Sequence, residues 1–137
     1  MTRDEMLRFV PPAAELLGRE IVEIDETRGA VVLRYTAQPS FLNRHGTVQG
    51  GLLAAMLDSA TALALYAVLP IDLTGVTTSL NASFLRPAKL CTFTARALLV
   101  SRTERSAETR GELTDSDGLL VARATATLRI VPRKRTE

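Results

Sequence analysis

A single carboxylate, Asp58, lies within a long apolar stretch of the 137-residue chain. Leu52 to Leu69 is rich in Ala and Leu and has no Gly or Pro before Pro70, which predicts a helix. The residues of this helix are apolar on every face, which is typical of a helix buried on most sides. A buried carboxylate is costly unless it is paired, hydrogen-bonded or protonated. Asp58 therefore either caps a neighbouring loop or faces solvent, or it acts as a general base or nucleophile.

Two glycines, Gly50 and Gly51, fall where this helix should begin. The first N–H groups of a helix lack intrahelical partners, and the helix dipole favours negative charge there. The pair could stabilise a developing oxyanion, or could simply be a tightly packed helix start. At about 1.5 Å per residue, Asp58 lies roughly 10–12 Å farther along the axis. The two groups therefore serve different sites, or a second subunit supplies one of them.

These residues belong to the pattern Asn43-x-x-Gly46-x-x-Gln49-Gly50-Gly51 followed by Leu57-Asp58. This pattern resembles the signature of PaaI-like acyl-CoA thioesterases, which have the hotdog fold. Most members have His where this chain has Gln49. A second block, Gly75 to Lys89, resembles the long strand that follows the family's helix. The resemblance implies hydrolysis of an acyl-CoA, a reaction that requires no metal and no redox cofactor.

The resemblance also implies catalytic roles for individual residues. Asp58 matches the family's acidic position, and Gly50 offers the backbone oxyanion donor. Asn43 would bind the thioester carbonyl or position water, although Asn is also a common turn residue. Thr77 matches a hydroxyl residue that assists the carboxylate. Gln49 keeps hydrogen-bonding capacity without a titratable group.

The expected substrate-binding residues are Gln49, Gly51, Phe84, Arg86 and Lys89. Arg86 and Lys89 lie in the second block and suit the phosphates of coenzyme A. Arg102 and Arg105 could do the same, although basic residues at strand ends are usually only solvated. The residues expected to shape the acyl pocket are Leu53, Ala54, Leu57, Ala62, Tyr66 and Phe84. They leave room for an aryl or medium-chain group.

The rest of the chain predicts the elements that position these residues. Arg3 to Leu17 reads as an amphipathic helix that Pro11 and Pro12 interrupt or split. Strands are predicted at Ile21–Ile24, Ala30–Tyr35, Val76–Phe84, Thr92–Ser101, Arg105–Leu113 and Leu119–Ile130. In Val76–Phe84, strict alternation places Val76, Leu80 and Phe84 on one face and Thr77 on the polar face.

The sum is a single α+β domain, 1–137, in which an antiparallel sheet wraps one long helix: the hotdog fold. Residues 131–137 are expected to form a frayed basic tail. A sheet covers only one side of the helix, so a partner subunit would bury the remainder. This fits the family's homodimers and dimers of dimers.

The sequence has no pattern typical of a metal site, a serine-hydrolase triad or a nucleic-acid interface. His45 is the only histidine, is expected on an exposed loop, and has no nearby His or Cys with which to bind a metal. No Gly-x-Ser-x-Gly elbow occurs, and Cys91 is expected to be a small buried hydrophobe. A net charge of +2 without a recognition pattern argues against nucleic acid. With no membrane span or signal peptide expected, we predict a cytoplasmic protein.

Two rival functions remain. A hotdog hydratase or dehydratase would use a histidine together with a carboxylate, and the absence of His at position 49 argues against it. A non-catalytic acyl-CoA-binding or regulatory module is the other, because a fold does not determine function.

Overall fold

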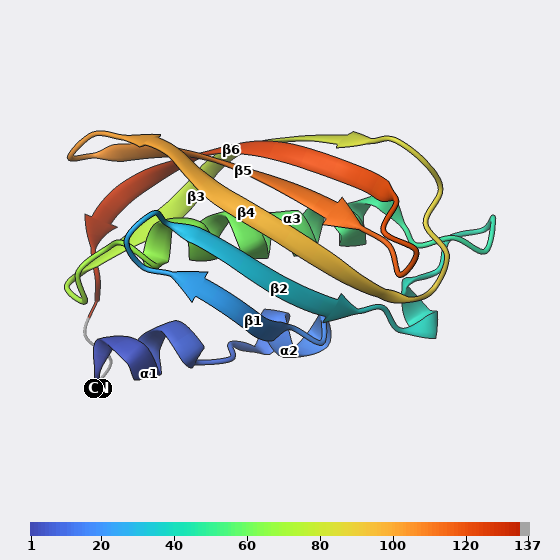
Figure 1. Ribbon diagram of the computed structural model, residues 1–137, viewed down its shortest axis with the longest axis horizontal. Helices are drawn as coiled ribbons and strands as arrows, with labels where there is room; N and C mark the ends of the chain where they lie inside the picture. Colours follow the sequence, from blue (N-terminus) through green and yellow to red (C-terminus); the bar gives the residue numbers. More distant parts are fainter. Residues whose placement is uncertain (135–137) are drawn as a thin grey trace.

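The computed structural model describes residues 1–134 and contains one antiparallel sheet wrapped around one long helix (Figure 1). The helices are α1 (Arg3–Arg8), α2 (Pro12–Leu16) and α3 (Gly50–Tyr66), with a 3-10 turn, η1 (Pro39–Phe41). The strands are β1 (Glu20–Asp25), β2 (Ala30–Thr36), β3 (Leu73–Phe84), β4 (Thr92–Arg102), β5 (Ser106–Thr114) and β6 (Leu120–Pro132). Their order across the sheet is β1-β2-β4-β5-β6-β3. The predicted hotdog fold is confirmed.

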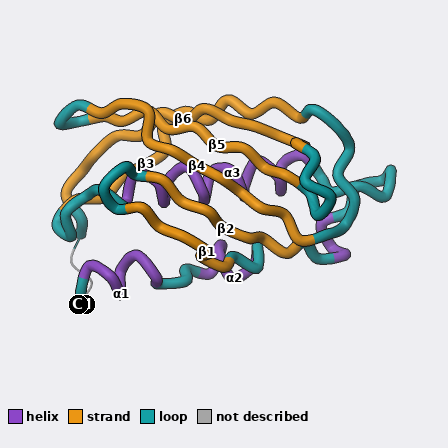
Figure 2. Tube along the Cα trace, in the orientation of Figure 1, coloured by secondary structure: helices purple, strands orange, loops and turns teal. Residues whose placement is uncertain are grey.

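The long helix α3 packs against the inner face of the sheet, as Figure 2 shows. Its buried side chains include Leu53, Met56, Leu57 and Leu63. They contact small residues of the sheet, which allow close approach. A Cβ at Gly111 in β5 would lie 3.1 Å from Thr61 Cγ2 and 3.4 Å from Leu57 Cδ2. Among residues 1–134, no helix combines the length and apolarity that a membrane span requires.

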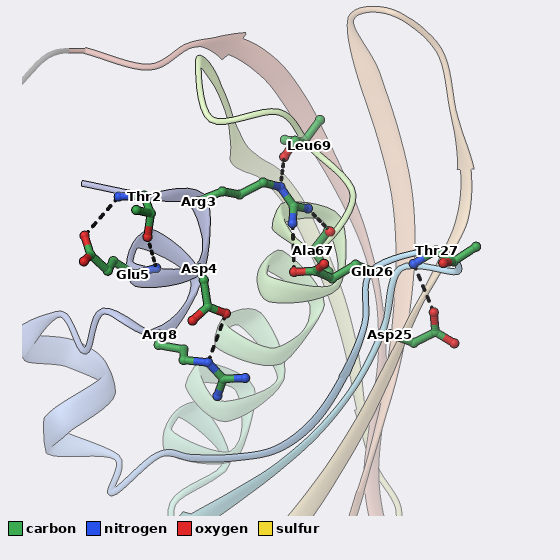
Figure 3. Close-up of polar contacts among 10 residues, drawn as sticks. All are labelled: Thr2, Arg3, Asp4, Glu5, Arg8, Asp25, Glu26, Thr27, Ala67 and Leu69. Atoms are coloured by element: carbon green, nitrogen blue, oxygen red, sulfur yellow. Dashed lines mark hydrogen bonds and ion pairs between the residues drawn. The ribbon is translucent and has the colours of Figure 1, made fainter.

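The N-terminal segment is two helices: α1 ends at Arg8, and α2 begins with Pro11 as its N-cap and Pro12 as its first residue. α1 begins with a capping box between Thr2 and Glu5 (Figure 3). Arg3 then holds α1 against the segment after α3. Its guanidinium donates to the carbonyls of Ala67 and Leu69 and pairs with Glu26 at 2.8 Å. Cationic groups are favourable at this end of a helix, where carbonyls lack partners.

The alternation predicted for β3 is wrong in its first part, because the register against β6 shifts between Thr77 and Ser79. Thr77 is paired with buried Leu128, and Val76 with exposed Arg129. Paired residues on antiparallel strands point to the same face. Thr77 therefore faces the helix, and Val76 lies on the outer face with 52% of its surface exposed.

The frayed tail predicted for 131–137 is wrong at its beginning. Val131 and Pro132 continue β6, paired with Thr74 and Leu73. Arg133 donates from its backbone to Asp72 O and from its side chain to Ile71 O. Residues 135–137, with Arg135 of the predicted basic tail, lie outside the described residues.

Candidate active site

A pocket of about 410 Å³ opens at the N-terminal end of α3. Five residues predicted from the sequence line it: Asn43, Gly50, Leu53, Phe84 and Arg86. The other lining residues are Thr47, Val48, Leu85, Pro87 and Ala88. The loop before α3, the start of α3 and the segment after β3 thus meet at one place. A hydrogen bond from Val48 N to Ala88 O, 2.8 Å long, ties the loop to that segment.

Gly50 is the first residue of α3, with Gln49 as its N-cap. No side chain caps this end, and within residues 1–134 neither Gly50 N–H nor Gly51 N–H has a hydrogen-bond partner. A Cβ at Gly50 would lie 3.4 Å from Phe84 Cζ, so the aromatic ring covers the helix start. The pocket therefore presents an unpartnered N–H donor beside an apolar wall, which suits an anionic oxygen on an acyl group.

Asn43 is held by the turn that it begins. Its Oδ1 accepts from the backbone N–H of His45 at 2.9 Å and of Thr47 at 3.2 Å. Its Nδ2 donates to Thr47 Oγ1 at 3.0 Å. Gly46, with φ of +77°, closes the turn in a conformation that glycine adopts readily. Asn43 therefore stabilises the turn through its side chain, and the same residue also lines the pocket.

Asp58 lies eight residues after Gly50 and does not line this pocket. It shares a helix face with Gly51, Ala55 and Ala62, and all four are half-buried or exposed. Its Oδ1 atom is buried and has no hydrogen-bond partner within residues 1–134. Nothing in the described part of the chain holds this carboxylate, although leaving such an atom unpaired is unfavourable.

Behind Asp58, the buried Tyr35 hydroxyl donates to Ser59 Oγ at 2.8 Å. Burial raises the pKa of Tyr35 to about 12, and the negative charge of Asp58 acts in the same direction. The Ser59 hydrogen bond and the charge of Arg19 oppose this rise. Tyr35 therefore stays a neutral donor on the β2 side of α3.

The remaining predicted residues lie around or away from the pocket. Gln49, Gly51 and Lys89 are exposed near the start of α3 but do not line the pocket. Thr77 faces the helix and lies two residues after Gly75, where an added Cβ would meet Leu65 and Tyr66 in the C-terminal half of α3. Arg102 and Arg105 lie at the β4–β5 turn, the end of β4 remote from the pocket (Figure 1).

Among the residues expected to shape the acyl pocket, Leu53 and Phe84 line it. Leu57 is fully buried in the core, and Tyr66 donates to Gly75 O at 2.7 Å at the far end of α3. Ala54 and Ala62 are half-buried on α3 and do not line the pocket.

His45 is exposed, as predicted. Cys91 is half-buried against the core rather than fully buried. Among residues 1–134, no group of three or more His, Cys, Asp or Glu side chains is placed to hold a metal.

Thr47 was not anticipated as a site residue. Its position four residues after Asn43, with Gly46 between them, is the signal that an Asx turn leaves in a sequence.

A larger hollow of about 820 Å³ lies on the outer face of the sheet and contains none of the predicted site residues. Its charged lining carries both signs: Arg28, Arg96, Arg110 and Arg123 with Glu23, Asp25 and Glu112. This mixture is typical of a solvated sheet face.

The chain is similar to known thioesterases. The sequence model of the Thioesterase superfamily matches residues 45–122. A phenylacetic acid degradation-related protein of Ralstonia eutropha is 42% identical with a TM-score of 0.88, over 93% of this chain and 98% of that one. A point mutant of the phenylacetic acid degradation protein PaaI of Thermus thermophilus is 32% identical with a TM-score of 0.77, over 87% and 98%.

The E. coli PaaI protein, from the phenylacetic acid degradation operon, is 25% identical with a TM-score of 0.80. The match covers 88% of this chain and 85% of that one. The comparison with curated proteins gives no significant match.

Proposed function

Because this chain belongs to the thioesterase superfamily, as a PaaI-like hotdog thioester hydrolase, we propose that it cleaves acyl-CoA to a free acid and coenzyme A. The observation that carries the proposal is the pocket at the start of α3. It presents the unpartnered N–H of Gly50 beside Asn43, with Arg86 at its edge. An N–H at a helix start can hold the oxyanion of a thioester hydrolysis, and a guanidinium suits a phosphate of coenzyme A.

The catalytic carboxylate comes from a second subunit in this proposal. If Gly50 of each subunit faces Asp58 of the other, the twofold axis passes beside Ala54, midway between them on α3. The residues near that axis are small: Gly51 is exposed, and Ala54 and Ala55 are half-buried. Two copies of α3 could therefore approach closely there, which would also cover the exposed part of the half-buried Asp58.

The two edges of the sheet differ in a way that supports this dimer. β1 is six residues long and carries Glu20, Glu23 and Asp25. β3 is twelve residues long and has no charged side chain. Short, charged edges resist pairing, whereas a long uncharged edge favours it. We therefore assign β3 to the homodimer interface. A further pairing of dimers is expected from the family resemblance.

The chemistry follows from these positions. The thioester carbonyl oxygen accepts a hydrogen bond from Gly50 N–H. Asp58 of the partner subunit takes a proton from water, and the resulting hydroxide adds to the carbonyl carbon. Collapse of the tetrahedral intermediate breaks the C–S bond, and the departing thiolate receives the proton from Asp58. In the nucleophilic alternative, Asp58 itself attacks the carbonyl carbon, the C–S bond breaks and the thiolate leaves a mixed anhydride. Water then hydrolyses the anhydride to the free acid and the Asp58 carboxylate, and the thiolate takes up the proton that this step releases.

Release of free thiol from a panel of aryl and medium-chain acyl-CoAs tests the function. We expect turnover by the wild type and at least about a hundredfold lower kcat in Asp58→Asn, with the oligomer intact. Binding of acyl-CoA without turnover on any substrate would identify a non-catalytic module. Hydration of an enoyl-CoA would identify the hydratase instead. Transfer of ¹⁸O from labelled water into Asp58 during turnover distinguishes the nucleophile from the base.

A further inference from the structure

We propose that Thr47 is a positioning residue that leaves the Asn43 side chain with a single free function, one N–H donor offered to the thioester carbonyl. The proposal rests on the proposed function, since it specifies what one residue of the same pocket can do. Both residues line the pocket. The loop that joins them is closed by backbone hydrogen bonds from Asn43 N to Thr47 O at 2.8 Å and from Gly46 N to Asn43 O at 3.1 Å.

The orientation of the Asn43 amide is fixed by its partners. The backbone N–H groups of His45 and Thr47 can only donate, so the side-chain atom that meets them must be the oxygen. These two donors and the Thr47 hydroxyl, which donates to Oδ1 at 3.2 Å, use the acceptor capacity of that oxygen. The same hydroxyl oxygen accepts from Nδ2 at 3.0 Å. Contact with both ends of the amide restricts its rotation.

This arrangement decides between two roles for Asn43. Positioning a water molecule by accepting its hydrogen would need a free lone pair on Oδ1, and both are used. Nδ2 has two hydrogens, of which Thr47 Oγ1 receives one. Within residues 1–134 the second has no partner, so it is the hydrogen-bonding capacity that remains to the side chain. Asn43 is therefore a donor to the substrate carbonyl, in the same pocket as Gly50 N–H, and Thr47 acts through Asn43 rather than on the substrate.

Three single variants and one double variant test this arrangement. Thr47→Val keeps the shape of the side chain and removes the hydroxyl, so kcat should fall about tenfold with KM little changed. Thr47→Ser keeps the hydroxyl and should restore most of the activity. Asn43→Asp keeps an oxygen for the two backbone donors but replaces the free N–H with an anion, so kcat should fall about a hundredfold or more. Thr47→Val added to Asn43→Asp should cost nothing further, because Thr47 acts through the amide.

A matched control is Thr114→Val, which removes a hydroxyl hydrogen bond to Thr94 O remote from the pocket. It should leave kcat unchanged. Wild-type kcat in Thr47→Val would overturn the proposal. An additive loss in the Asn43→Asp background would also overturn it, and so would equal losses in Thr47→Val and Thr47→Ser accompanied by a lower unfolding midpoint.

A readout that needs no turnover separates this proposal from the proposed function. In ¹⁵N NMR spectra of the unliganded protein, one of the two Asn43 side-chain amide protons should exchange slowly, and Thr47→Val should abolish that protection. If the wild type hydrolyses no acyl-CoA, the proposed function fails. The NMR result still decides whether Thr47 fixes the amide, because equal exchange of both protons in the wild type would refute it.

Discussion

Replacing Asp58 with alanine should inactivate the enzyme without weakening its fold. Removing a buried group usually destabilises a protein, but Asp58 Oδ1 is buried and unpaired within the described residues of the protomer. An unsatisfied buried polar atom costs about 1–3 kcal/mol, and alanine exceeds aspartate in helix propensity by roughly 0.7 kcal/mol. We therefore expect the free energy of unfolding to stay the same or to rise by about 1 kcal/mol. In the same protein, kcat should fall at least about a hundredfold.

Urea titration at one fixed protein concentration measures the stability, and thiol release measures the activity. Asp115→Ala is the matched control, because Asp115 Oδ1 accepts from Asp117 N and Leu119 N at 2.9 Å each. That variant should lose about 1 kcal/mol of stability and keep its activity. A loss of about 2 kcal/mol or more in Asp58→Ala with kcat retained would show that Asp58 supports the structure and not the reaction.

Three further perturbations test other parts of the account. The pKa of Tyr35 is raised from an ordinary 10.0 to about 12, so the stability that this shift contributes is fully present below pH 10 and is lost as pH rises through 12. Urea titrations across that range should show the free energy of unfolding falling by about 2–3 kcal/mol in the wild type but not in Tyr35→Phe. The same pH dependence in both proteins would contradict the burial of the hydroxyl. The Cβ that Gly51→Ala adds would meet nothing within 4 Å in the single chain, so helix propensity alone predicts that the free energy of unfolding rises by about 1 kcal/mol. If a partner helix lies at that position, the variant should instead dimerise more weakly in analytical ultracentrifugation and have lower activity. Arg86→Gln should raise KM for acyl-CoA but not for acyl-pantetheine, which lacks the adenosine phosphates; equal effects on both substrates would remove Arg86 from the phosphate site.

The hotdog fold could be predicted from the sequence because its elements have strong patterns. The apolar segment after Gly51 forms α3, and the alternation in Leu119–Ile130 appears as β6. The face of Thr77 could not be predicted, because one extra residue in β3 exchanges the faces of everything before it. Val131 and Pro132 precede basic and polar residues that are typical of a frayed end, so the sequence predicts a tail there. Pairing with β3 nevertheless extends β6 through both residues.

The candidate site could be predicted in part. Asn43, Gly50, Phe84 and Arg86 come together because a loop, a helix start and a strand end converge, and each lies in one of the two motif blocks. The motif does not explain why Asp58 stays apart from them. The spacing along one helix does, since about 12 Å separates residues eight positions apart. Thr47 was missed because its contribution is a set of hydrogen bonds within a turn, to which residue type alone gives little weight.

The claim on which the whole account depends is that each site combines Gly50 of one subunit with Asp58 of the other. Gly50→Pro removes the N–H that would hold the oxyanion. The helix should tolerate the substitution, because proline is favoured at the first helical position and the preceding residue, Gln49, already has a ψ of 132°, which suits a residue before proline. Chains carrying Gly50→Pro and chains carrying Asp58→Asn, each with its own affinity tag, can be co-expressed and the heterodimer isolated through both tags. One of its two sites would then carry both lesions and the other neither, so thiol release should return to about half of the wild-type rate. A heterodimer as inactive as its two parents would contradict the shared site.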